Sequence, residues 1–203
     1  MTRMLPGLAA ALAIAAVIGP ARAQSPFKPE DVQAGTYTVD SKETLVRYGT
    51  IHMGISEFWG TFPGAKGTLM IDPKALGDAK LDVSVPIATV STTNKDLDAQ
   101  FLSSTFFDAA KYPQMRFVST SVTPTGPTTA KVAGDLTLHG VTRPIVLDAT
   151  FTGAGPNHFT KVFTIGFKAQ GQINRSDFGI GKWVPVVSDA TTIDISAAFE
   201  KKT

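Results

Sequence analysis

Apolar and polar residues alternate with a period of two along most of the chain after Tyr37. The clearest runs, with an apolar residue at every second position, cover residues 81–87, 145–151, 163–169 and 193–199. Such alternation is typical of strands with one face in a core and the other in water. Weaker runs of the same kind cover residues 36–40, 44–49, 67–72, 115–121 and 131–138. The pattern therefore predicts eight or nine β-strands.

Turn-forming residues separate these runs. Reversals are expected at Asp72-Pro73, Thr123-Pro124, Gly126-Pro127, His139-Gly140 and within residues 153–157. An antiparallel sheet of this size curls, and closure removes its exposed edges. The predicted fold is all-β: a single antiparallel barrel of about eight strands, a size that can hold one small ligand inside.

One segment departs from the alternation and is expected to be a short inserted helix, over residues 93–103. Leu97, Phe101 and Leu102 fall on one side of a helix there. Thr93 and Asp96 resemble a capping box at its start.

Residues 1–23 have the organisation of a secretory signal peptide. Arg3 supplies a positive start, and an uninterrupted apolar run from Leu8 to Ile18 follows it. Pro20 and the small-x-small sequence Ala21-Arg22-Ala23 then form a cleavage site. The apolar run is shorter than the roughly 20 residues that span a bilayer. It also lacks the polar face that a helix at the surface of a domain would need. We therefore expect a mature domain over residues 24–203, exported to a bacterial periplasm.

The charge and the cysteine count exclude several classes of function. Removal of Arg3 and Arg22 leaves 17 basic against 17 acidic residues, so the mature chain has little electrostatic reason to bind nucleic acid. Without cysteine it has no disulfide, thiol nucleophile, thiolate metal site or lipoprotein anchor. No later segment is apolar for long enough to be membrane-integral. Neither a cofactor nor a catalytic motif such as Gly-x-Ser-x-Gly is predicted.

The histidines do not predict a metal site. His52, His139 and His158 are the three in the chain, and their spacing matches no ligand signature. His52 alone is a candidate for one polar contact to a ligand.

Five segments together resemble the YceI-like family of periplasmic lipid- or polyisoprenoid-binding proteins, which have a lipocalin-like barrel. They are residues 37–40, 52–56 with 60–62, 106–108 with 111–113, 134–144 and 174–179. The order of the five segments also matches. A departure is Ser41-Lys42-Glu43, which replaces a stretch where histidine is common. The resemblance implies a hydrophobic cavity that holds a long isoprenoid or fatty chain.

The 13 phenylalanines are candidates for the walls of such a cavity, because aromatic rings bury an apolar chain without requiring hydrogen bonds from it. The candidates are Phe101, Phe106, Phe107, Phe117, Phe163, Phe167 and Phe178. The alternative for each is an ordinary packed core. Phe106 and Phe107 are favoured, although neighbours on a strand face opposite sides and one of the two is expected to line the cavity. Trp183 is expected to cap one end of the barrel and to contact the ligand.

Arg175 has two interpretations. Its guanidinium suits a polar or phosphorylated head group. Alternatively, it forms a structural ion pair in a bulge fixed by the side chains of Asn174 and Asp177. The structural role is favoured.

We expect non-covalent binding, carriage or storage of an apolar small molecule, such as a polyisoprenoid, an isoprenoid quinone or a fatty acid or amide. Two alternatives remain at this stage: an enzyme that modifies a lipid in the same cavity, and a structural stress or adhesion protein whose barrel is filled by side chains. The absence of a compelling acid–base pair argues against the enzyme. A monomer and a homodimer are both compatible with the sequence.

The cleavage site yields a direct prediction. Secreted protein should begin at Gln24, because Ala21-Arg22-Ala23 after the apolar run matches the small-x-small pattern that a signal peptidase cleaves. Intact-mass measurement of the exported chain tests this, and a product that retains residues 8–18 would contradict export to the periplasm.

Overall fold

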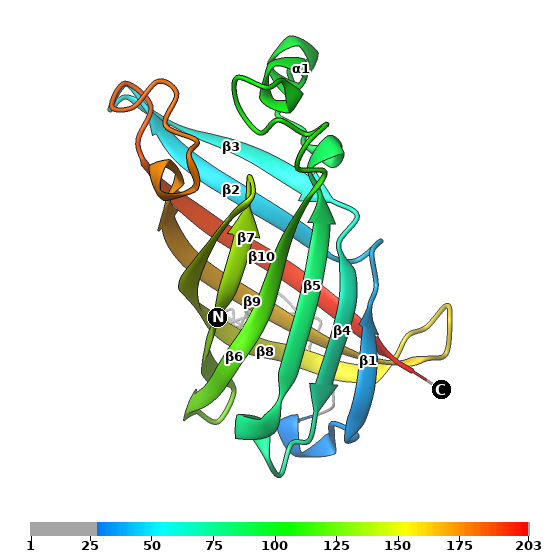
Figure 1. The fold of residues 1–203 in the computed structure, drawn as a ribbon. Coiled ribbons are helices and arrows are strands. Elements are labelled where there is room, and N and C mark those ends of the chain that lie inside the picture. The colour runs from blue at the N-terminus through cyan, green and yellow to red at the C-terminus, as the bar shows by residue number, and fades with distance from the viewer. Residues whose placement is uncertain (1–27, 203) are drawn as a thin grey trace, which may run out of the picture.

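The computed structural model describes residues 28–202, so the predicted signal peptide and its cleavage site lie outside the described residues. The strands of the described part join edge to edge in one antiparallel sheet (Figure 1). They are β1 (Gly35–Val39), β2 (Leu45–His52), β3 (Ser56–Pro63), β4 (Lys66–Ile71), β5 (Lys80–Pro86), β6 (Gln114–Gly126), β7 (Thr129–Leu138), β8 (Val141–Pro156), β9 (Phe163–Asn174) and β10 (Ala190–Lys201).

The sheet closes on itself because β10 pairs with two partners in succession. Its first part, residues 192–196, pairs with β2, and its last part, residues 199–201, pairs with β1. β1 and β2 thus form one interrupted barrel strand, and β3 and β4 form another. At the interruption, the Thr44 hydroxyl accepts from the N–H of Ala198 and donates to its carbonyl, which also accepts from the backbone N–H of Asp40. The result is a closed antiparallel barrel of eight strands, which confirms the predicted fold.

The inserted helix is also present, with a different cap. α1 (Lys95–Leu102) begins after Asn94, whose side chain accepts hydrogen bonds from the N–H groups of Asp96 and Leu97. The expected cap at Thr93 is therefore wrong; Thr93 has a φ of 66°. Four short 3-10 helices complete the elements of residues 28–202: η1 (Pro29–Asp31), η2 (Leu76–Asp78), η3 (Ile87–Thr89) and η4 (Arg175–Phe178). No helix within residues 28–202 is both long and apolar enough to cross a membrane.

Three further details differ from the predicted pattern. β3 was absent from the alternating runs, because Phe58 and Trp59 are adjacent and Gly60 leaves a gap in its apolar face. Thr123-Pro124 is not a reversal but part of β6, whose register shifts between residues 124 and 126. β8 continues to Pro156, so its reversal comes later, at residues 157–162. Bulges of this kind let long strands bend around a barrel.

The connections divide the barrel into two ends. At one end lie the β2–β3 turn, the β5–β6 segment with α1, the β7–β8 turn and the β9–β10 loop; we call it the α1 end (Figure 1). At the other lie η1, η2, the β6–β7 turn and the β8–β9 loop; we call it the η1 end. The β7–β8 turn is the predicted His139-Gly140, and both residues have the positive φ values of 51° and 75° that a tight hairpin requires.

The β9–β10 loop, residues 175–189, is organised around one buried arginine. Arg175 is 6% exposed. Its guanidinium donates to the backbone oxygens of Ile180, Lys182, Val187 and Ser188, at 2.7–3.0 Å. Burial lowers the pKa of this guanidinium below its usual range. The expected ion pair and bulge are therefore replaced by a 3-10 helix and a set of carbonyl acceptors, which fix the loop.

Replacement of Arg175 by Met should destabilise the protein by about 2–4 kcal/mol. Each buried carbonyl left without a donor costs about 1–3 kcal/mol, and hydration of some of the carbonyls limits the total. Arg175→Lys should recover little, since one ammonium group cannot span the acceptors of a planar guanidinium. Chemical denaturation measures both effects. Arg116→Met is the matched control: Arg116 forms an exposed ion pair with Asp82, which contributes little. Equal effects at the two positions would contradict the role of Arg175.

Candidate ligand-binding cavity

The inward faces of the strands surround a cavity of about 1050 Å³. On β8, Ile145, Leu147, Ala149 and Phe151 all line it. Only Leu147 is fully buried among these four, whereas the other three stay partly exposed although they face the inside of the barrel. Partial exposure on an inward face means that the side chains opposite do not fill the space between them. The barrel is therefore hollow rather than packed through its middle.

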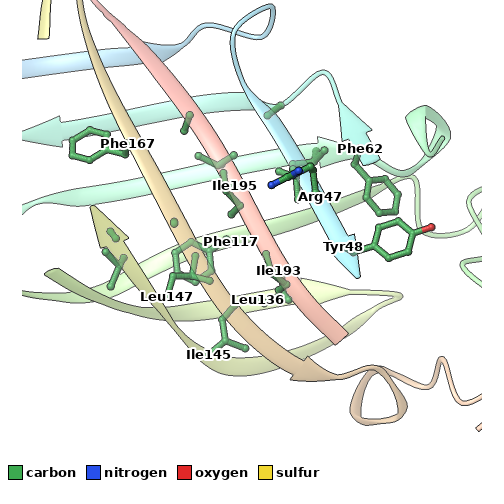
Figure 2. A pocket seen from close by; sticks show the side chains of 18 of the residues that line it. Arg47, Tyr48, Phe62, Phe117, Leu136, Ile145, Leu147, Phe167, Ile193 and Ile195 are labelled. Carbon is green, nitrogen blue, oxygen red and sulfur yellow. The ribbon is translucent and has the colours of Figure 1, made fainter. Parts of the chain in front are cut away.

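The wall of this chamber is aliphatic and aromatic (Figure 2). Its labelled apolar members on β6 to β10 are Phe117, Leu136, Ile145, Leu147, Phe167, Ile193 and Ile195. A small-residue pair contributes to the open space, because Ala149 on β8 lies directly opposite Ala169 on β9. Such a wall can bury an apolar chain but offers it few hydrogen bonds.

Aromatic rings close the α1 end of the chamber. Phe101 on α1 stacks on Phe106 with ring centroids 4.4 Å apart, and Phe107 meets both rings edge-on. Trp183, from the β9–β10 loop, lies 5.6 Å from Phe106. Phe62 on β3 lies 5.7 Å from Phe107. The cluster thus joins α1, the segment after it, the β9–β10 loop and β3 into one apolar cap.

Tyr48 adds a buried hydroxyl to this cap. Its ring packs against Phe62 at 5.5 Å, beside it at the same end of the chamber in Figure 2, and its hydroxyl lies over Gly60, where a side chain would collide with it. The hydroxyl is enclosed and has no hydrogen-bond partner within the described part of the chain. Burial, together with the negative charge of Asp98, raises the pKa of Tyr48 above its usual range. The group is therefore a neutral phenol.

The arginines near the chamber are already engaged. Arg47 pairs with Asp194 at 2.7 Å and lies over the Trp59 ring at 5.4 Å. Since neighbours on a strand alternate, it faces away from the side of β2 that carries Tyr48. Arg175 is held by the carbonyls of its own loop. Arg116, the third arginine at the cavity wall, pairs with Asp82 at 2.6 Å, so all three lining arginines already have partners.

Most of the predicted site residues contribute to the cavity wall. Those that line it are Phe101, Phe106, Phe107, Phe117, Phe167, Trp183, His52 and Arg175. Phe163 and Phe178 are outside the wall: Phe178 is 1% exposed in the packed core, and Phe163 packs in the cluster near the η1 end. The expectation that only one of Phe106 and Phe107 would line the cavity is wrong, because they lie in a turn after α1 and not on a strand.

The histidines are kept apart. His139 Nδ1 lies 3.0 Å from the carbonyl of Phe178 and its ring meets Tyr112, whereas His52 is exposed at the end of β2. His158 is in the β8–β9 loop at the opposite end. Within residues 28–202, no group of three or more His, Cys, Asp or Glu side chains is placed to hold a metal ion.

Sequence reasoning missed several wall residues. Phe151 and Phe199 lie on strands that were predicted correctly, and their alternation already placed them on an apolar face. Phe62 and Tyr48 depend on β3, which was not predicted, and on its pairing with β2. The local pattern therefore contained the signal for the first two, but not for the aromatic cap.

Comparison with known proteins agrees with this architecture. The model of the YceI-like domain matches residues 37–199. A UPF0312 protein of Pseudomonas fluorescens is 39% identical over 176 residues, which cover 83% of this chain and 87% of the relative.

Solved structures share the fold. A YceI protein of Campylobacter jejuni is 32% identical with a TM-score of 0.67, over 75% of this chain and 90% of that one. BcnA of Burkholderia cenocepacia is 24% identical with a TM-score of 0.71, over 79% and 98% of the two chains. A polyisoprenoid binding domain from Saccharophagus degradans is 13% identical with a TM-score of 0.63, over 84% of this chain and all of that one. Since the family model spans the barrel from β1 to β10, the chain belongs to the YceI-like family.

Proposed function

We propose that the barrel binds one long apolar molecule, such as a polyisoprenoid, an isoprenoid quinone or a fatty acid or amide, and carries or stores it in the periplasm. The hollow interior is the observation that supports this most directly. Its volume of about 1050 Å³ lies at the upper end of the roughly 300–1,000 Å³ that is usual for ligand sites. A barrel that served only as a scaffold would have no reason to leave its core unfilled.

The energetics favour a chain over a compact polar ligand. Each methylene that leaves water contributes about 0.8 kcal/mol, whereas association itself costs about 4–15 kcal/mol. A long chain supplies many methylenes along one path, so burial alone can exceed the cost of association. The wall requires few polar groups for this, and the aromatic cap of Tyr48, Phe62, Phe101, Phe106, Phe107 and Trp183 keeps one end dry.

The proposal is binding without chemical conversion. Catalysis on a lipid would need an acid or a base that faces the chamber. Burial raises the pKa of the Tyr48 phenol, which makes it a weaker acid and keeps it protonated, so that no phenolate is present to act as a base. Arg175 is engaged within its loop. The choice of ligand class is supported by the related Saccharophagus degradans fold, which is described as polyisoprenoid-binding.

Solvent extraction of protein purified from its native periplasm, followed by mass spectrometry, tests the function. One apolar molecule per chain is expected. A mixture of a lipid and its chemical product would favour the enzyme, and an empty protein that takes up no apolar dye would contradict the proposal.

Filling the chamber should abolish binding while the barrel stays folded. Ala169 faces the chamber from β9, opposite Ala149 and beside Ile195, so Ala169→Phe places a ring in open space. We expect uptake of an isoprenoid quinone to fall at least ten-fold, with a stability change of no more than the about 1–3 kcal/mol typical of overpacking.

The control is Gln170→Phe, the next residue along the same strand, which is exposed on the outer face. It adds the same ring without entering the chamber and should leave quinone uptake unchanged. Equal uptake by the two variants would show that the ligand does not occupy the middle of the barrel.

A further inference from the structure

The exposed apolar side chains of the barrel gather at one place. Within the described residues, ten large apolar side chains are exposed, and six of them lie at the end of β2, in the β2–β3 turn or in the β9–β10 loop. These six, which we call the apolar tip, are Ile51, Met53, Ile55, Trp183, Val184 and Val186. Ile55 is 81% exposed, and Val186 is 57% exposed. Single exposed apolar residues are ordinary, but a contiguous group of them marks an interaction surface.

The two segments of the apolar tip are joined into one body. Met53 donates its backbone N–H to the carbonyl of Val186 at 2.7 Å, and Ser188 donates to the carbonyl of Ile51 at 2.8 Å. Figure 1 shows them side by side, projecting beyond the ends of β9 and β10. Arg175 fixes the β9–β10 loop through hydrogen bonds to the carbonyls of Lys182 and Ser188. The exposed side chains are therefore held in place on a rigid support, and their exposure is not the result of a loose loop.

The apolar tip is continuous with the wall of the cavity. Trp183 and Val186 belong to both, and His52 lines the cavity beside Met53 of the tip. Trp183 therefore belongs both to the cap that closes this end of the chamber and to the tip outside it, and the polar side chains of Thr50, His52 and Ser56 line the cavity nearby. A water-insoluble ligand must be exchanged with another apolar phase. Because the tip is continuous with the cavity wall, we expect that apolar phase to contact the tip.

The shape and charge of the tip fit a lipid surface better than a second protein. Its most exposed member, Ile55, lies in the β2–β3 turn, which projects at the α1 end together with the β9–β10 loop (Figure 1). From Met53 to Ile55 the turn carries no charge. Trp183, with Lys182 placed over its ring at 4.9 Å, combines an apolar body with a polar edge, as do side chains at membrane interfaces.

We propose that the apolar tip inserts into the surface of a lipid bilayer and thereby docks the α1 end of the barrel where its ligand resides. The interaction is driven by burial of aliphatic side chains and not by charge. It differs from cavity binding, since Met53 and Ile55 do not line the chamber.

Co-sedimentation of the mature protein with phosphatidylcholine vesicles tests the docking. Binding is expected, and it should persist at high salt because the turn is uncharged. Ile55→Glu should lower the partition coefficient about ten-fold or more, since full burial of one aliphatic side chain has an effect of this size. The control is Phe159→Glu, which removes a side chain that is 95% exposed at the opposite, η1 end. This control should bind as the unmodified chain does.

Insertion can also be read directly. The chain has two tryptophans, so Trp59→Phe leaves Trp183 as the single reporter. Its fluorescence should be quenched by vesicles with brominated acyl chains, and this quenching should be lost in Ile55→Glu.

The inference would be overturned if the unmodified chain did not bind vesicles, or if binding required anionic lipid and disappeared in salt. Loss of binding in Phe159→Glu would also contradict it. So would a dimer, seen in sedimentation velocity, that Ile55→Glu dissociates while vesicles stay unbound. Uptake of an isoprenoid quinone from detergent solution separates the two proposals. Ile55→Glu should retain it, so failure to dock would leave the cavity function standing.

Discussion

Closure of the sheet through β10 is the constraint on which the remaining structure depends. This strand pairs with β9 along nearly its whole length on one side, and with β2 and then β1 on the other. Without the second set of pairs the sheet would have two open edges and its apolar face would collapse or find a partner. With them, that face becomes the inner wall of a barrel. Because β10 changes partner near Ala198, the two short strands β1 and β2 together occupy the position of one barrel strand.

The aromatic cap closes the barrel at the α1 end, whereas the hollow interior extends to the η1 end, where Pro29, Pro73 and residues 126–130 line it. Near the η1 end, Tyr37, Leu69, Ile165 and Phe199 form a buried cluster, and the aromatic cap closes the α1 end. In the middle, Ala149 and Ala169 lie side by side on adjacent strands of the wall, and larger side chains near them, such as Ile145 and Phe151, stay partly exposed. The aromatic cap and this buried cluster supply burial that holds the fold together. Because they do so, the middle can remain open for a ligand without loss of the barrel.

The β9–β10 loop connects three features of the molecule. Arg175 fixes its backbone, Trp183 contributes to the aromatic cap, and Val186 bonds to the β2–β3 turn. A long loop at the mouth of a barrel normally loses much conformational entropy when it is ordered. Here one side chain that donates four hydrogen bonds offsets this cost locally. The proposed docking surface and the closed end of the cavity therefore share one structural support.

Much of the fold follows from local properties of the chain. Period-two alternation and turn chemistry depend only on near neighbours, so most strands, the His139-Gly140 hairpin and the helical insertion were predictable from the sequence. β3 was not, because Gly60 interrupts its apolar face. Its neighbour across the sheet, Tyr48, fills that gap, and this compensation appears only when the strands are paired.

The candidate site depended on tertiary structure to a greater extent. Alternation assigns a side chain to a face, but whether that face is packed or hollow depends on the residues opposite, and these come from distant strands. Phe117 and Phe178 look alike in sequence, yet one lines the chamber and the other is core. The sequence alone allows Arg175 to bind a ligand head group, whereas in the folded chain its guanidinium is engaged by backbone carbonyls of its own loop. The apolar tip joins residues more than a hundred positions apart, so only closure of the barrel brings them together.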